Sequence, residues 1–376
     1  VAIGVGSRGI AQLPRVVAGV VKWVQGQGAE AFIVPAMGSH GGAYAEGQRG
    51  ILEGYGITEA AVGAPIRSCM EVVELPRGDL PVPLHFDRRA SEATATILIN
   101  RIKVHTDFQG PYESGLMKMA AIGIGKLEAA QAIHRLGVRG LRDLMPRVAL
   151  QQLRQSNIVL GVALVENAYA EIGRLEVIRA EQIPAREREL LEFSRALLPS
   201  LPLDELDILI IDHMGKDISG VGMDPHIVGR MRILDEPEPA RPRIRTIVVR
   251  DLTPASKGNA LGMGLADIMT RKIRDQIDWQ AMYANAVTST FYERVKMPLV
   301  AEHDAQAMEF ALRACGHTDP ANLRIIRIRN TLRLKHLIVS EGVLKALKVP
   351  TTLKVLQPMG KPFDGNHLAH WEPADA

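Results

Sequence analysis

The sequence predicts an α/β protein of two domains, each a mostly parallel sheet flanked by helices, with the active site in the cleft between them. The first observation is that short β-rich runs alternate with helical patterns along the chain. The second is that 376 residues with 47% hydrophobic content exceed what one ordinary core holds. The third is a proline-containing break, Pro199-Ser200-Leu201-Pro202, that separates two such patterns.

The first domain, residues 1–200, is expected to carry the cofactor and the catalytic residues. Its expected strands are residues 1–5, 31–35, 71–75, 96–100, 158–164 and 174–178. Helices are expected from about Pro14, near residues 44–53 and over residues 185–197. Pro14 suits a first helical turn because the N–H that proline lacks would be unpaired there.

The second domain, residues 201–345, repeats the α/β pattern and is expected to close the cleft. Its expected strands are residues 206–211, 246–249 and 323–328, with helices between them. Residues 236–242 include three prolines and are expected to form an exposed loop. The remaining residues, 346–376, are expected to form a C-terminal tail that can pack back on the first domain.

Composition favours a small-molecule partner over nucleic acid or a membrane. The 45 basic and 42 acidic residues are interspersed, so no polybasic stretch is present. The two cysteines, Cys69 and Cys315, provide no disulfide scaffold or Cys-based metal site, which fits a reducing cytoplasm. No apolar run is long enough for a bilayer span and no signal peptide is visible. We expect a cytoplasmic protein and leave a homo-oligomer open.

Glycine loops at strand ends indicate an anion-binding crevice. Gly4-Val5-Gly6-Ser7-Arg8-Gly9 matches the dinucleotide pattern G-x-G-x-x-G, but the next strand ends in Met37-Gly38-Ser39-His40 without the acidic residue that holds a ribose. An NAD-dependent 2-hydroxy acid dehydrogenase is therefore the alternative function. Gly123-Ile124-Gly125-Lys126 fails as a phosphate loop, because Leu127 stands where serine or threonine would bind magnesium.

Two histidines follow expected strands and are candidates for acid–base chemistry. His40 lies in a glycine loop after the second strand, and His105 comes five residues after residue 100, where the fourth strand ends. Each taken alone could equally satisfy loop hydrogen bonds. A pair that faces a substrate from opposite sides is what racemisation requires, because one takes the hydroxyl proton and the other gives one back.

Two further residues have both a structural and a chemical interpretation. His134 lies near the end of a helix that is expected to stop at Gly137, where the helix dipole alone favours a histidine. Lys118 lies in an apolar stretch, where its amine could be desolvated and nucleophilic or could simply extend to solvent.

Taken in order, these residues resemble the nickel-dependent lactate racemase family. The resemblance rests on Arg8 after the first strand, His40 in a Gly-Ser-His loop, His105, Lys118, and His134 sixteen residues after that lysine. It covers most of residues 1–170. It extends more loosely to the second domain, through residues 215–224, which begin Gly-Lys-Asp-Ile-Ser-Gly.

The resemblance implies an isomerase that inverts C2 of a 2-hydroxy acid by hydride transfer to a nickel-pincer nucleotide. This cofactor is pyridinium-3,5-bisthiocarboxylic acid mononucleotide carrying nickel. One imidazole beside carbon and sulfur donors agrees with the preferences of nickel. The implied roles are the acid–base pair His40 and His105, the carboxylate-binding Arg8, the cofactor contacts Lys118, Ser39 and Gly41, and the nickel ligand His134.

The sequence departs from the family pattern in two places. The first loop, Val5-Gly6-Ser7-Arg8-Gly9, lacks the family's acidic residue and its Thr-Arg-Pro sequence. The polar residues that close over lactate from the second domain have no clear match, and Lys257 is the expected replacement in substrate binding. These departures favour a sugar acid, epimerised at C2, over lactate. A non-catalytic module that binds a sugar acid or a nucleotide is the alternative outside enzymes.

Overall fold

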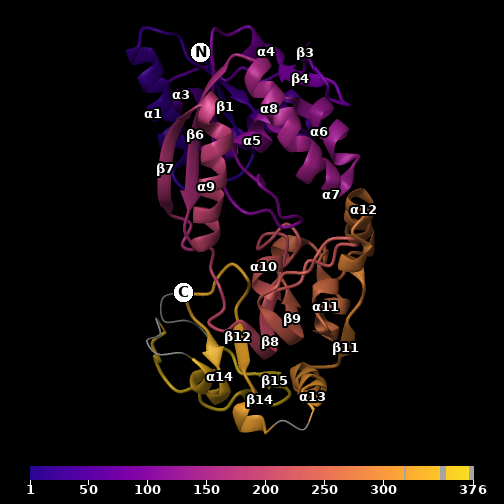
Figure 1. Ribbon diagram of the computed structural model, residues 1–376. Helices are drawn as coiled ribbons and strands as arrows, with labels where there is room; N and C mark the ends of the chain where they lie inside the picture. The colour runs from indigo at the N-terminus through magenta and orange to yellow at the C-terminus, as the bar shows by residue number, and fades with distance from the viewer. Residues whose placement is uncertain (317–318, 348–352, 372–376) are drawn as a thin grey trace. The chain divides into compact units, whose positions relative to one another are not determined.

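The computed structural model describes residues 1–316, 319–347 and 353–371. The chain divides into two compact units, Val1–Leu198 and Pro199–Ala376 (Figure 1). Each unit is built on a mostly parallel sheet flanked by helices, which confirms the predicted α/β class. No helix in these described ranges is long and apolar enough to cross a bilayer.

The sheet of the first unit has five strands in the order β2-β1-β5-β6-β7. Its strands are β1 (Ala2–Val5), β2 (Phe32–Pro35), β5 (Thr96–Arg101), β6 (Ile158–Glu166) and β7 (Ile172–Arg179). All pairs are parallel except β6 with β7. The chain leaves β1 toward β2 on one side, and β5 lies on the other. Strand order therefore reverses between β1 and β5, where open α/β sheets form a crevice at the carboxyl ends of the strands.

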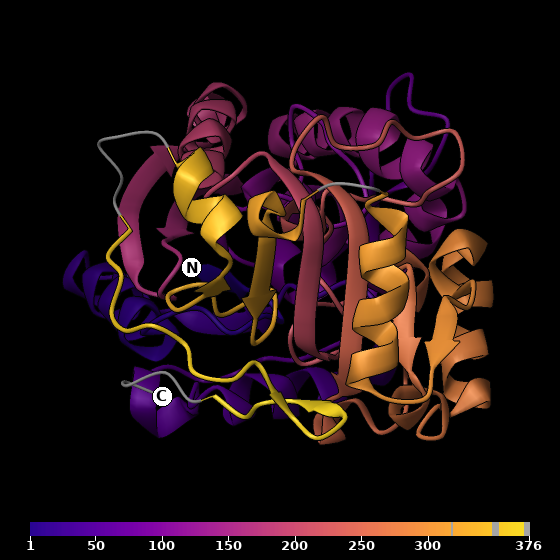
Figure 2. The same ribbon diagram turned by 90° about the horizontal axis from the view of Figure 1, so that it is seen from below.

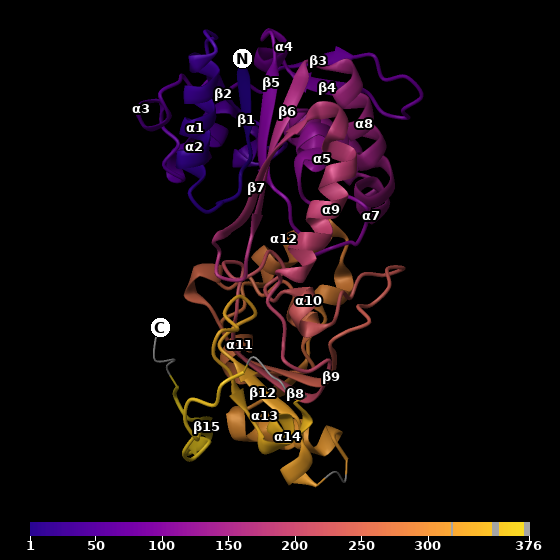
Figure 3. The ribbon, with the colours of Figure 1, turned by 60° about the vertical axis from the view of Figure 1, so that its left-hand side comes forward.

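Helices cover both faces of this sheet (Figure 3). One face carries α1 (Leu13–Gly26), α2 (Ala45–Gly54) and α3 (Glu59–Val62), and the other carries α5 (Leu116–Lys118), α8 (Met145–Gln155) and α9 (Ile183–Ala196). Helix α1 buries Leu13, Val17, Val21 and Val24, which recur every three or four residues. This spacing places them on one helical stripe that packs on Ile3 and Ile33 of the sheet.

The strand expected at residues 71–75 forms, but it lies outside the main sheet. As β3 (Val72–Leu75) it pairs antiparallel with β4 (Leu84–Asp87) in a separate two-stranded sheet. The sequence analysis missed β4. A short connection joins the two strands, and such connections give antiparallel neighbours, whereas a parallel neighbour needs a long crossover.

The remaining elements of the first unit are short. They are η1 (Gly41–Ala43), α4 (Arg88–Ser91), η2 (Met119–Gly123), α6 (Lys126–His134), α7 (Gly137–Arg139), η3 (Gly140–Leu144) and η4 (Ala180–Gln182). Of these, η2 and η3 are π-helical turns. Such turns are rare and frequently occur at functional sites, and η2 directly follows Lys118.

The sheet of the second unit has six strands in the order β11-β10-β9-β8-β12-β13. They are β8 (Glu205–Met214), β9 (Arg243–Leu252), β10 (Ile268–Thr270), β11 (Leu299–Ala301), β12 (Ile325–Ile328) and β13 (Ile338–Val339). Only β13 is antiparallel to its neighbour. The sequence analysis missed the short strands β10, β11 and β13.

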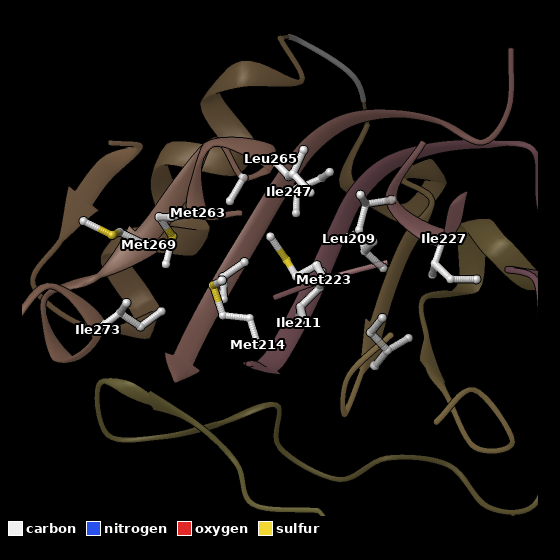
Figure 4. Close-up of a cluster of buried hydrophobic side chains, with 14 of the residues drawn as sticks. Leu209, Ile211, Met214, Met223, Ile227, Ile247, Met263, Leu265, Met269 and Ile273 are labelled. Carbon is white, nitrogen blue, oxygen red and sulfur yellow. The ribbon is translucent and has the colours of Figure 1, made fainter. Parts of the chain in front are cut away.

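Apolar side chains fill both faces of this second sheet. Figure 4 shows Met214, Met223, Met263 and Met269 among the leucines and isoleucines of one face. Helix α13 (Asp304–Ala314) packs on the opposite face (Figure 2). The other helices are α10 (Pro225–Val228), η5 (Pro254–Ser256), η6 (Met263–Leu265), α11 (Arg271–Arg274), α12 (Trp279–Ser289), η7 (Tyr292–Val295), η8 (Pro320–Asn322) and α14 (Glu341–Ala346).

The described end of the chain is bound to the second unit. It contains the hairpin of β14 (Phe363–Asp364) and β15 (His367–Leu368). The Trp371 indole donates to Asp212 at 2.8 Å, and the Leu368 N–H donates to the Asp304 carboxylate at 2.9 Å. Residues 348–352 and 372–376 of the expected tail lie outside the described residues. Packing of the tail on the first domain stays a prediction.

Candidate active site

The carboxyl-terminal edge of the first sheet collects the predicted catalytic residues of that unit. Arg8 follows β1, His40 follows β2 and His105 follows β5. Because these strands are parallel neighbours in the sheet, their carboxyl ends meet at one edge. Lys118 ends α5 and His134 ends α6.

Lys118 and His105 are in direct contact. Lys118 Nζ lies 2.9 Å from His105 Nε2, and the His105 side chain is only 16% exposed. The backbone N–H of Asp107 donates to His105 Nδ1 at 3.1 Å. Nδ1 is therefore held by the backbone, and Nε2 is the ring nitrogen that faces Lys118.

Burial has a large effect on the protonation of this pair. Burial, followed by the positive charges of Arg8 and Lys103, lowers the pKa of Lys118 to about 8, against the opposing effect of Asp107. Burial and then the charge of Lys118 lower the pKa of His105 well below its ordinary value. Lys118 is thus able to act as a nucleophile near neutral pH, and His105 is a neutral imidazole.

The lowered pKa of Lys118 predicts selective chemistry. Amine labelling of Lys118 by an acylating reagent should rise with a midpoint near pH 8, because only the neutral amine reacts. Peptide mass spectrometry across pH 6–11 measures it, with exposed Lys22 of α1 as the control. A Lys118 midpoint equal to that of Lys22 would show that the site does not desolvate the amine.

His40 is held beside the first loop. Its Nδ1 forms a hydrogen bond with the Ser7 hydroxyl, although part of the residue is exposed. Burial first, and then the positive charges of Arg8, Lys118 and His134, lower the pKa of His40 to about 4. The ring is neutral at physiological pH and can accept a proton. His40 follows β2 at the sheet edge where Arg8 follows β1, and the charges of Arg8 and Lys118 both affect its pKa.

Glycines clamp the His40 loop to the first turn of α2. A Cβ added at Gly47 would overlap the carbonyl oxygen of Gly41, so the two backbones can approach only because both residues lack side chains. The buried Gln48 amide donates to the carbonyl oxygens of Gly38 and His40, at 2.9 Å and 3.3 Å. Ser39 and Gly41, the predicted cofactor contacts, lie in this fixed loop.

The His105 loop is held by Glu113, which the sequence analysis missed. Its fully buried carboxylate accepts from the N–H groups of His105 at 2.7 Å and Gly110 at 3.1 Å. It also forms an ion pair with Arg195 of α9. The charge pairing offsets the cost of burying the carboxylate. In the sequence, Glu113 is visible only as an acidic residue beside an apolar stretch, and its partner Arg195 lies far along the chain.

Glu187 positions Lys118 from the other side, and the sequence analysis also missed it. Its carboxylate, fully buried on α9, accepts from the Met117 N–H at 2.9 Å and so satisfies the start of α5. A Cβ at Gly115 would overlap this carboxylate. Burial raises the pKa of Glu187 to about 7.

This raised pKa predicts a pH dependence of stability. Folding takes up a proton between the ordinary pKa of 4.5 and about 7, so the free energy of unfolding should fall as pH rises through that window. In the unsubstituted protein this decrease in the free energy of unfolding should be on the order of 2–3 kcal/mol. In Glu187→Gln the free energy of unfolding should depend much less on pH, because the amide does not titrate. Urea unfolding at pH 5 and pH 7.5 measures it, with the exposed Glu181→Gln as the control. An unchanged pH slope in Glu187→Gln would contradict the assignment.

His134 presents a ring at the surface of the cluster. The residue lies at the end of α6 and is exposed. Desolvation of the ring by neighbouring residues, and then the charge of Lys118, lower the pKa of its imidazole. No group of three or more His, Cys, Asp or Glu side chains is arranged for a metal ion among the described residues.

The other predicted features do not join this cluster. Lys257 lies in the second unit, after η5, and its contact with substrate stays a prediction, as does a cleft between the domains. Lys126 is fully buried and lies 2.9 Å from the Asp87 carboxylate, which agrees with its rejection as a phosphate-binding lysine. A cavity of 680 Å³ between α8 and β6 is lined by residues such as Leu150 and Arg154 and by none of the predicted site residues.

Glycines of the first loop also serve packing. A Cβ at Gly6 would lie 3.2 Å from the Met119 side chain and 3.3 Å from that of Asn100. Helix α1 begins only at Leu13, after the last glycine of the G-x-G-x-x-G match. This arrangement differs from the dinucleotide motif, in which the third glycine lies within the helix.

Comparison with known proteins identifies no family. No family model and no curated protein matches the chain. Among solved structures, the chain is similar to the lactate racemase apoprotein from Thermoanaerobacterium thermosaccharolyticum, with 13% sequence identity and a TM-score of 0.47 over 88% of this chain and 85% of that chain. A likeness at this level assigns neither a family nor an activity.

Proposed function

We propose that this chain is an isomerase that inverts C2 of a small 2-hydroxy acid, as a racemase or an epimerase. The observation that carries the proposal is that Arg8, His40 and His105 follow neighbouring parallel strands and that Lys118 of α5 contacts His105. Lys118 contacts His105 at 2.9 Å, and the charges of Arg8 and Lys118 act on His40. Two neutral imidazoles, an amine and a guanidinium are thereby available to one small anion.

Each group has a role in this proposal. Arg8 binds the substrate carboxylate, for which the planar guanidinium offers two parallel hydrogen bonds. One histidine would take the proton of the 2-hydroxyl as the C2 hydrogen passes as hydride to the bound cofactor, which would leave a 2-keto acid. The second histidine would protonate the carbonyl oxygen when hydride returns to the other face of C2. His40 and His105 therefore exchange roles between the two stereoisomers.

The proposed cofactor is the nickel-pincer nucleotide, and the residues fit it. His134 would bind the nickel, and the carbon and sulfur atoms of the pincer would supply its other donors. The Lys118 amine would contact or anchor the group, and the Ser39 and Gly41 loop would also contact it. When bound, the cofactor would supply the carbon that accepts and returns hydride.

The proposed substrate is a sugar acid rather than lactate, with Lys257 as a further contact. This extension rests on the departures of the first loop and of the second domain from the lactate racemase pattern. The two cysteines are both free and buried, which supports a proposed cytoplasmic location.

The test is to produce the chain together with the enzymes that synthesise the cofactor. We expect about one nickel per chain by elemental analysis, and interconversion of C2 epimers of an aldonate by chiral chromatography. NAD-dependent oxidation by a nickel-free protein would instead show a dehydrogenase. Ligand-induced thermal stabilisation without turnover in the nickel-loaded protein would show a binding module.

A further inference from the structure

The second unit has a crevice of its own at a reversal of strand order. The chain leaves β8 toward β9 and returns to β12 on the opposite side of β8 (Figure 1). A cavity of 390 Å³ lies at the carboxyl ends of these strands. It is lined in part by His213, Asp217, Thr253, Arg329, Asn330 and Arg333. Ligands of open α/β sheets bind at such positions, in pockets of about 300–1,000 Å³.

Hydrogen bonds fix the loops that line this cavity. Thr253 Oγ1 donates to Asp217 at 2.5 Å and lies 2.7 Å from Ser256 Oγ. A Cβ at Gly215 would overlap the Thr253 hydroxyl, so the loop after β8 reaches that after β9 only with glycine there. The Asn330 side chain accepts from the backbone N–H of Arg333 at 3.0 Å. Hydrogen bonds within the protein therefore hold these loops.

Two arginines that line this cavity have guanidinium groups with no protein partner in the described part of the chain. No hydrogen bond or ion pair joins the side chain of Arg329 or Arg333 to another residue in the described part of the chain. By contrast, Arg250 and Arg327 of the neighbouring strands are both paired with Asp212. Unpaired guanidinium groups in a preformed pocket suit a bidentate carboxylate or phosphate.

Two further residues that line the cavity select between these anions. Asp217 and Thr253 place a carboxylate and a hydroxyl in the same cavity. A carboxylate there repels a second negative charge on the ligand and accepts hydrogen bonds from hydroxyl groups. This combination of two cations with hydrogen-bond acceptors disfavours inorganic phosphate and favours a monoanion rich in hydroxyls.

We propose that this cavity is a binding site for a polyhydroxylated carboxylate. Arg329 and Arg333 hold the carboxylate, and Asp217 and Thr253 hydrogen-bond to hydroxyl groups along the carbon chain. The site lies within the second unit. Its loop after β9 also carries Lys257, so the site shares a loop and a ligand class with the proposed function but does not rest on it. It requires neither nickel nor the histidines of the first unit, so it stands if that function fails.

The experiment is calorimetric titration of D-gluconate into the full, metal-free chain carrying Arg8→Gln. This substitution removes the guanidinium group that is proposed to bind the substrate carboxylate in the first unit. We expect binding to persist in Arg8→Gln and to weaken about tenfold or more when Arg329→Gln or Arg333→Gln is added. Arg313→Gln, at an exposed arginine of α13, is the matched control and should change nothing. Circular dichroism verifies the fold of each variant.

Three results would overturn the proposal. One is no binding of D-gluconate to the Arg8→Gln protein. The second is an equal affinity in the Arg329→Gln, Arg333→Gln and Arg313→Gln backgrounds. The third is inorganic phosphate, or D-glucose, binding as tightly as D-gluconate, because the site would then not require both the carboxylate and the hydroxyls.

Discussion

His40→Ala and His105→Ala are each expected to slow the interconversion by about a hundred- to ten-thousand-fold, in both directions. The rate falls in both directions because each histidine is the base for one stereoisomer and the acid for the other. Both directions also pass through the same keto acid. Initial rates from each pure stereoisomer, with nickel content held equal, measure the effect.

Ser7→Ala is the matched control for His40. It removes the hydroxyl that forms a hydrogen bond with His40 Nδ1 but leaves the ring in place. Its cost should be about tenfold or less, since a single hydrogen bond contributes about 1 kcal/mol. Full activity in His40→Ala or His105→Ala would remove that residue from the proposed pair. A loss in one direction only would contradict the shared intermediate.

His134→Ala is expected to abolish nickel retention while the fold survives. The side chain is exposed at the end of α6, so its removal costs the core little, whereas it supplies the only protein bond to the metal in this account. Elemental analysis and thermal unfolding measure the two effects separately. His367→Ala, at an exposed histidine of the second unit, should keep its nickel. Unchanged nickel in His134→Ala would show that the ligand assignment is wrong.

Much of the fold could be predicted because local patterns decide it. The buried runs that became β1, β2, β5 and β6 are short, apolar and separated by helical patterns, which is the signature of parallel strands. The sequence predicted less where the structure depends on which strands pair with each other rather than on the local tendency to form a strand. Strand β3 could join the main sheet or β4, and only the short connection between them favours the hairpin.

The candidate site shows the same division. His40 and His105 could be predicted because each follows a strand, and strand ends of a parallel sheet converge. Glu113 and Glu187 could not, because their partners lie far along the chain. Glu113 pairs with Arg195, and Glu187 caps a helix seventy residues before it. A buried carboxylate acts through tertiary contacts, which leave no periodic pattern in the sequence.

The central claim is that hydrogen leaves C2 as hydride and returns to the same carbon. The most direct measurement uses substrate deuterated at C2 in ordinary water, with mass spectrometry of the inverted product. The account predicts that the label stays on C2 with little loss to solvent. If a histidine instead removed the C2 hydrogen as a proton, the label would exchange with water, and extensive washout would contradict the account.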